Sequence, residues 1–217
     1  MLPPRLLRGY ASFRYGRYRS ENERYRRLAE SGQDPGVLVV ACCDSRAAPE
    51  LIFDASPGEI FVARNVANLV PPYSPDGEYH GTSAALEFAV MGLKVQDIVV
   101  MGHGRCGGIK AALAAGESDP LSPGDFIGKW ISLLEKPVAE CMCHADDDAA
   151  ARQQRLEHLS IVHSLANLRT FPCINALEGM GRIRLHGAWF DIALGELHVL
   201  DEATGQWERL DTPDTGM

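Results

Sequence analysis

The stretch Val37-Leu38-Val39-Val40-Ala41-Cys42-Cys43-Asp44-Ser45-Arg46 decides the fold class of this 217-residue chain. Its first six residues form a continuous apolar run after the turn residues Gln33-Asp34-Pro35-Gly36, which is typical of a strand buried on both faces of a sheet. Asp97-Ile98-Val99-Val100-Met101 repeats the pattern, and residues 59–63 predict a third strand. The chain therefore contains the strands of a buried parallel sheet.

Helical patterns follow these strands. Residues 81–92, 107–115, 123–134 and 148–169 predict helices, the last with a stripe formed by Leu156, Leu159, Val162, Leu165 and Leu168. Strands that alternate with helices predict an α/β fold with a mostly parallel sheet flanked by helices. Near the C-terminus, residues 189–192, 197–200 and 207–210 predict short strands, which we expect to form an antiparallel extension of the sheet.

The N-terminal segment is rich in arginine. Ser20-Glu21-Asn22-Glu23 matches the capping-box pattern and predicts an amphipathic helix over residues 20–31 that lies on another surface. We find neither a linker nor an internal repeat. The sequence therefore predicts one domain over residues 1–217, with an N-terminal helical arm (1–34) and an α/β core (35–217).

Composition and charge exclude several classes of protein. Hydrophobic residues make up 46% of the chain and charged residues 23%, as in an ordinary globular protein, and no apolar run is long enough to cross a bilayer. Residues 1–40 carry a net charge of +4 and the remainder −12, for a total of −8. This balance predicts no binding to nucleic acid. The sequence lacks a secretory signal pattern, so we predict a cytoplasmic protein with reduced cysteines that does not bind membranes.

Two of the predicted strands end in residues that bind metals. Cys42 ends the first, and Gly102-His103-Gly104-Arg105-Cys106 follows the second. Carboxyl ends of neighbouring parallel strands meet at one edge of a sheet, so Cys42, His103 and Cys106 can converge there. Two thiolates and one imidazole suit zinc, and three protein ligands leave a position open, as in catalytic zinc sites. Taken singly, each residue has an alternative role, Cys42 in the core and His103 in a loop hydrogen bond.

Asp44 and Arg46 follow the first of these residues at short spacing. A carboxylate two positions after a ligand lies near the metal, and a guanidinium two positions further can hold it through a bidentate pair. A second group, Cys141, Cys143 and His144, either forms another metal site or lies in a solvated loop, and we favour the loop.

The motifs together resemble the β-class carbonic anhydrases, and closely their plant-like subtype. The resemblance rests on residues 42–46, 58–68, 81–90, 103–108 and 164–170 and covers most of the chain. It implies a zinc enzyme that reversibly hydrates CO2 to bicarbonate and a proton by a zinc-bound hydroxide, and that self-associates as a dimer or an assembly of dimers. By position, Cys42, His103 and Cys106 match the zinc ligands, and Asp44 with Arg46 matches the dyad beside zinc-bound water.

The resemblance also implies a substrate pocket. Gln33 matches a pocket glutamine contributed across the dimer interface, and Phe61, Val66 and Gly107 match further pocket positions. Phe88 departs from the pattern, since plant-like members usually have tyrosine there. Val39 stands where members of the bicarbonate-inhibited subtype have tryptophan, which implies a permanently open site.

Two rival functions remain open on the same residues. One is hydrolysis of a CO2 analogue, carbon disulfide or carbonyl sulfide, at the same zinc site. The other is a non-catalytic zinc module in which Asp44 is a permanent fourth ligand.

Overall fold

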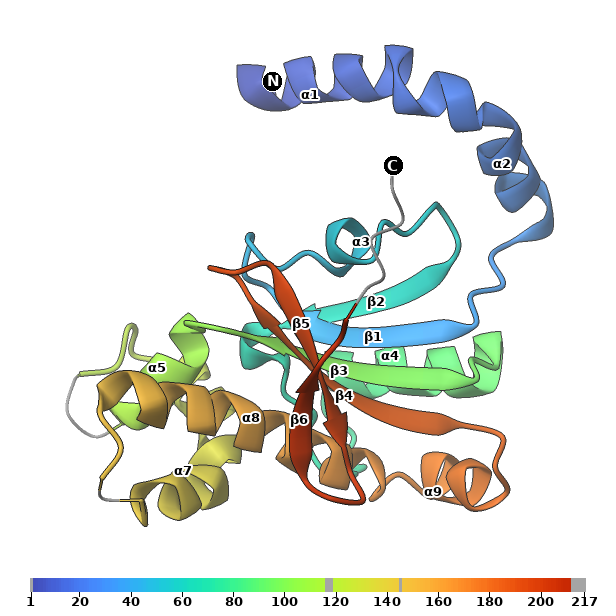
Figure 1. The fold of residues 1–217 in the computed structure, drawn as a ribbon. Helices are drawn as coiled ribbons and strands as arrows, with labels where there is room; N and C mark the ends of the chain where they lie inside the picture. Colours follow the sequence, from blue (N-terminus) through green and yellow to red (C-terminus); the bar gives the residue numbers. More distant parts are fainter. Residues whose placement is uncertain (1, 116–118, 145, 212–217) are drawn as a thin grey trace.

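The computed structural model describes residues 2–115, 119–144 and 146–211. A six-stranded sheet in the order β2-β1-β3-β4-β5-β6 runs through its centre (Figure 1). The strands are β1 (Val37–Cys42), β2 (Ile60–Asn65), β3 (Asp97–His103), β4 (Arg184–Asp191), β5 (Glu196–Asp201) and β6 (Gln206–Arg209). The first four are parallel to one another, whereas β5 and β6 are antiparallel to their neighbours. The predicted α/β fold with a mostly parallel sheet is confirmed.

The start of the antiparallel extension differs from the prediction. The strand predicted at residues 189–192 begins at Arg184 and pairs parallel with β3, so the antiparallel part consists of β5 and β6 only. The beginning of this strand was not predicted because its polar residues interrupt the apolar pattern of a buried strand. The side chains of Arg184 and His186 both bond to Asp97 of the neighbouring strand, at 2.7 and 2.8 Å, which allows two charged or polar residues in a paired strand.

The helices and helical turns connect the strands. They are α1 (Pro4–Tyr15), α2 (Arg17–Ser31), α3 (Pro49–Ile52), η1 (Val66–Asn68), α4 (Gly81–Glu87), η2 (Phe88–Leu93), α5 (Gly107–Leu113), α6 (Phe126–Ile131), η3 (Ser132–Leu134), α7 (Glu135–Met142), α8 (Ala149–Leu168) and α9 (Pro172–Gly179). The residue ranges of α1, α3, α7 and α9 were not predicted from the sequence. Each has proline in its first turn, where the absent N–H costs nothing, but proline in a sequence suggests a break.

The buried stripe of α8 also differs from the prediction. Leu156, Leu165 and Leu168 are buried as expected, but Val162 is 43% exposed and Ile161 takes its place in the core. The buried residues of α8 therefore follow the alternating three- and four-residue spacing of a helix, whereas the expected stripe had a constant spacing of three.

The two faces of the sheet are covered unequally. On one face, Leu38, Val40, Ile98 and Val100 pack against α4, η2, α8 and α9 in the main core. On the other face, a smaller cluster that includes Val39 and Met101 packs against Ile52 of α3. Most of the helical layer therefore lies on one side of the sheet.

Helices α1 and α2 form an arm that reaches away from the sheet (Figure 1). Neither helix has a buried residue. The arm meets the core where Arg24 Nε donates to the carbonyl of Pro57 at 2.8 Å and Arg24 Nη2 pairs with Glu59 at 2.9 Å. The predicted capping box is wrong: α2 begins at Arg17 after Gly16, and Ser20 lies inside the helix, where its hydroxyl donates to the carbonyl of Arg17. The division into one core and one arm over residues 1–217 stays a prediction.

In the described ranges, no helix combines the length and the hydropathy needed to cross a membrane.

Candidate active site

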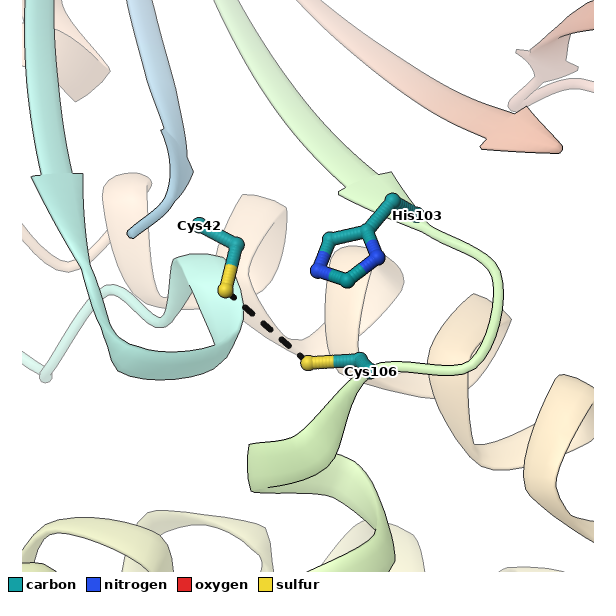
Figure 2. Close-up of side chains that lie close together, drawn as sticks. All are labelled: Cys42, His103 and Cys106. Carbon is teal, nitrogen blue, oxygen red and sulfur yellow. Dashed lines mark hydrogen bonds between the residues drawn. The ribbon is translucent and has the colours of Figure 1, made fainter. Parts of the chain in front are cut away.

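Strands β1 and β3 bring the predicted metal ligands together. The strands are parallel neighbours with Ala41 opposite Met101, so Cys42 and His103 lie at the same edge of the sheet. Cys106 follows one short turn later, directly before α5. The ligand atoms of the three residues all lie within 4.8 Å of one another, and the two sulfur atoms are 3.9 Å apart (Figure 2). The juxtaposition inferred from the two strand ends is confirmed.

The imidazole of His103 is oriented toward this cluster. Its Nδ1 lies 2.9 Å from the carbonyl oxygen of Gly104, so Nδ1 carries the proton and donates it there. Its Nε2 is buried and finds no hydrogen-bond partner in the part of the chain that the structure describes. A buried nitrogen lone pair without a partner costs free energy unless a cation or a donor meets it. Nε2 therefore faces the two sulfur atoms as a free ligand.

The two thiols favour a bound cation as well. The hydrogen bond from Cys106 lowers the pKa of the Cys42 thiol against the opposing effect of burial. The same pairing, together with burial, raises the pKa of Cys106. The sulfur atoms thus share a proton that a divalent cation would replace, and the set of two sulfurs and one nitrogen is one that zinc prefers. The residues present fit a zinc ion.

Asp44 and Arg46 form the bidentate pair that their spacing predicted. Arg46 Nε lies 2.9 Å from Asp44 Oδ1 and Nη2 lies 2.7 Å from Oδ2, while the backbone N–H of Arg46 also donates to Oδ1. These bonds hold the pKa of Asp44 well below its usual range. Asp44 Oδ2 lies 3.8 Å from Nε2 of His103, so an ionised carboxylate borders the cluster.

Arg64, for which no sequence pattern predicted a role, supports this edge of the sheet. Its guanidinium donates to the carbonyl of Cys42 at 2.8 Å and to that of Asp44 at 2.7 Å. These contacts hold the backbone on both sides of Cys43. Arg64 lies on β2 between Ala63 and Asn65, and no sequence spacing links it to Cys42.

Comparisons with known proteins agree with this geometry. Residues 37–197 match the family model described as carbonic anhydrase. A carbonic anhydrase of Pseudomonas aeruginosa is 37% identical over 205 residues, which are 94% of this chain and 90% of that protein. The structure of the β-carbonic anhydrase CcaA superimposes with a TM-score of 0.88 at 28% identity and covers 96% of this chain and 92% of that one. A tetrameric β-carbonic anhydrase from Sordaria macrospora gives a TM-score of 0.75 at 30% identity, covering 90% and 95%.

The chain belongs to the β-class carbonic anhydrases. Enzymes of this class interconvert CO2 and bicarbonate with zinc as the cofactor, and the Cys42, His103 and Cys106 cluster is the place on this chain that suits that ion.

The pocket positions implied by the β-carbonic anhydrase resemblance fall into two groups. Val66 and Gly107 border the cluster: Val66 follows β2 directly, and Gly107 begins α5 next to Cys106 with open space where a Cβ would lie. Phe61 and Phe88 lie together elsewhere, with ring centroids 5.9 Å apart.

Phe61 and Gln33 are far from the cluster of their own chain. Phe61 is opposite Leu38, four residues before the level of Cys42, which is roughly 13 Å along the strand. Gln33 is exposed and precedes β1, so it lies toward the opposite edge of the sheet. The fold of a single chain therefore does not bring Gln33, Phe61 and Phe88 to its own cluster of Cys42, His103 and Cys106.

The second group of possible ligands does not form a site. Cys141 is buried within α7, and its thiol donates to the carbonyl of Arg152 at 3.3 Å, so the prediction of a solvated loop is wrong for this residue. Cys143 is exposed. Across residues 2–115, 119–144 and 146–211, Cys42, His103 and Cys106 are the group of histidine, cysteine and carboxylate side chains with metal-binding distances.

Proposed function

We propose that Cys42, His103 and Cys106 are the zinc ligands of this carbonic anhydrase. The observation that carries the assignment is the buried, unpartnered Nε2 of His103 beside two sulfur atoms 3.9 Å apart. When bound, zinc supplies a Lewis acid that lowers the pKa of water and so provides hydroxide at neutral pH. The carbonyl of Gly104 fixes the tautomer of His103 that such binding requires.

Asp44 and Arg46 act on the reacting water. Asp44 is ionised and has its carboxylate beside Nε2 of His103, so it can accept a hydrogen bond from a water molecule at the cluster and direct the lone pair of that oxygen toward CO2. Arg46 binds both carboxylate oxygens and so holds the acceptor in one orientation. The same bonds argue against a permanent fourth ligand at Asp44, as the non-catalytic zinc module would require.

Three variants test these roles. Cys106→Ser removes a ligand, so zinc content and CO2 hydration should fall together. Asp44→Asn should retain zinc but lose most activity in stopped-flow hydration, since the amide cannot keep both bonds to Arg46. Cys43→Ser is the control, because Cys43 neighbours a ligand but is exposed, and it should retain both. Full zinc occupancy in Cys106→Ser would contradict the ligand assignment.

A second copy of the chain supplies the remainder of the pocket in this proposal. Gln33, Phe61 and Phe88 lie away from their own cluster, and Phe88 is 53% exposed, so a neighbouring chain can receive them. Beside Val66 and Gly107, the phenyl rings would form an apolar wall for CO2 and Gln33 would donate to the developing bicarbonate oxygen.

Mixed dimers test this shared site. A dimer of one Asp44→Asn chain and one Gln33→Ala chain has one fully wild-type site if Gln33 acts across the interface, and none if it acts within its chain. Mixing the two variants should therefore restore up to half of the wild-type activity per dimer. A mixture no more active than the mean of its components would contradict the shared pocket.

Self-association is supported by the arm and by the thinly covered face of the sheet. The arm exposes Leu6, Leu7 and Tyr10 at 44 to 62%, which is more apolar surface than a free helix needs. A protein lacking residues 1–30 should dissociate or aggregate in size-exclusion chromatography with light scattering. Retention of the original mass and activity would contradict a role for the arm in assembly.

Three further assignments concern the subtype, the cellular location and the substrate. Val39 is buried within β1 and cannot donate a hydrogen bond as the tryptophan of the bicarbonate-inhibited subtype does, which supports the plant-like subtype. The six free cysteines support a cytoplasmic location. Turnover of carbonyl sulfide or carbon disulfide should be far below that of CO2; the reverse order would make the analogue hydrolase the function.

A further inference from the structure

Helix α8 carries a buried carboxylate directly behind the metal cluster. Glu157 is 2% exposed, and the structure shows no arginine or lysine paired with it among the described residues. Its oxygens instead accept from three neutral donors: Oε1 from the backbone N–H of Cys106 and the side-chain amide of Gln153, both at 3.0 Å, and Oε2 from the indole of Trp189 at 3.1 Å. Burying a carboxylate is costly, so this arrangement requires a reason other than packing.

The contacts of Glu157 concentrate on one peptide. Gln153, one helical turn earlier, donates to the carbonyl of Cys106 at 3.3 Å, while Glu157 accepts from the N–H of the same residue. The two side chains share a face of α8 because they are four residues apart. They therefore hold both polar groups of the Cys106 backbone.

The turn before Cys106 leaves little room for adjustment. The N–H of Gly104 donates to the carbonyl of Phe190 at 2.9 Å, and a Cβ on Gly104 would lie 3.2 Å from the ring of Trp189. Arg105 has a φ of 57°, in the left-handed region. Residues other than glycine rarely adopt this conformation, so contacts around the turn must stabilise it. The hydrogen bond from the Cys106 N–H to Glu157 is one of these contacts.

We propose that Glu157 is a positioning residue for the metal site: it fixes the Cys106 backbone so that its sulfur meets that of Cys42, and places a negative charge behind the pair. This inference rests on the proposed role of Cys106 as a ligand. Both effects strengthen the binding of a divalent cation, since the site is formed in advance and the field favours positive charge. Residues that support a ligand in this way typically contribute about 10- to 100-fold in metal affinity.

Zinc affinity of the full-length protein, measured by competition with a chromophoric chelator, tests the proposal. Glu157→Gln preserves the size of the side chain but removes its charge. The NH2 group of the glutamine would face one of the three N–H donors and cannot accept a hydrogen bond from it, so the dissociation constant for zinc should rise about 10- to 100-fold. Gln153→Ala, at a partly exposed position, keeps the carboxylate and should weaken zinc severalfold. Ser160→Ala is the control, because Ser160 is buried on the same helix but bonds only to the backbone of Glu157.

Cobalt substitution adds a readout that does not depend on activity. The thiolate-to-cobalt absorption bands should shift in Glu157→Gln and stay unchanged in Ser160→Ala. Affinity within twofold of wild type together with an unshifted spectrum in Glu157→Gln would overturn the proposal, as would an equal loss of affinity in the control. If Glu157→Gln does not fold, wild-type affinity in Gln153→Ala would overturn it. Failure of the ligand assignment is distinguishable, because Cys106→Ser would then retain zinc.

Discussion

Replacement of His158 by phenylalanine should make the protein less sensitive to acid. His158 lies on α8 and stacks on Trp207 of β6 with ring centroids 4.3 Å apart, while the ring of Trp189 meets its edge at 5.1 Å. Its Nε2 is buried without a hydrogen-bond partner within the described residues. Burial, with smaller effects of the nearby His198 and Arg155 charges, lowers the pKa of His158 from 6.5 to about 4.

The sign and size of the effect follow from this pKa. The folded state disfavours the protonated imidazole, so the contribution of His158 to stability is complete above pH 6.5 and is lost as the pH falls from 6.5 toward 4. His158 contributes about 3 kcal/mol to the free energy of unfolding when its imidazole is neutral in both states, and about 2 kcal/mol of this contribution is lost between pH 7.5 and 5. For a chain of this length, that is a decrease in Tm of about 4 to 8 °C.

Thermal unfolding of the zinc-loaded protein at pH 7.5 and at pH 5 measures this decrease in Tm. On acidification, wild type should lose about 4 to 8 °C more than His158→Phe, whose ring can still stack on Trp207. Exposed His144, changed to glutamine, is the control and should behave as wild type. Equal decreases in Tm for wild type and His158→Phe, or an NMR titration midpoint of His158 near 6.5, would refute the reasoning.

Three further predictions concern the metal, the core and regulation. Dialysis against a chelator should abolish CO2 hydration, and added zinc should restore it; activity that persists in metal-free protein would contradict the zinc assignment. Gly102→Val should destabilise the fold by about 1 to 3 kcal/mol in denaturant unfolding, because its Cβ would lie 2.7 Å from Ile161 Cδ1; an unchanged midpoint would contradict this close packing. Bicarbonate should inhibit CO2 hydration only as a competing product, since Val39 replaces tryptophan; cooperative inhibition would contradict the open-site subtype.

Local patterns in the sequence were sufficient for the central strands and for the grouping of Cys42, His103 and Cys106. The apolar runs of β1 and β3 are short and bounded by turn residues, as is typical of strands inside a parallel sheet, and the residues that end such strands lie at the carboxyl edge of the sheet. Cys42, His103 and Cys106 were therefore predictable from two strand ends. The Asp44–Arg46 pair was predictable because the two residues are only two positions apart in the sequence.

Features that depend on residues distant in sequence came only from the tertiary structure. The polar start of β4 is a strand because Asp97, on its neighbour, bonds to Arg184 and His186. Arg64 and Glu157 support the metal site through bonds to backbone groups of Cys42 and Cys106, 22 and 51 residues away. Such bonds have no sequence spacing, because a backbone group is present at every position and only the fold selects which one a side chain meets.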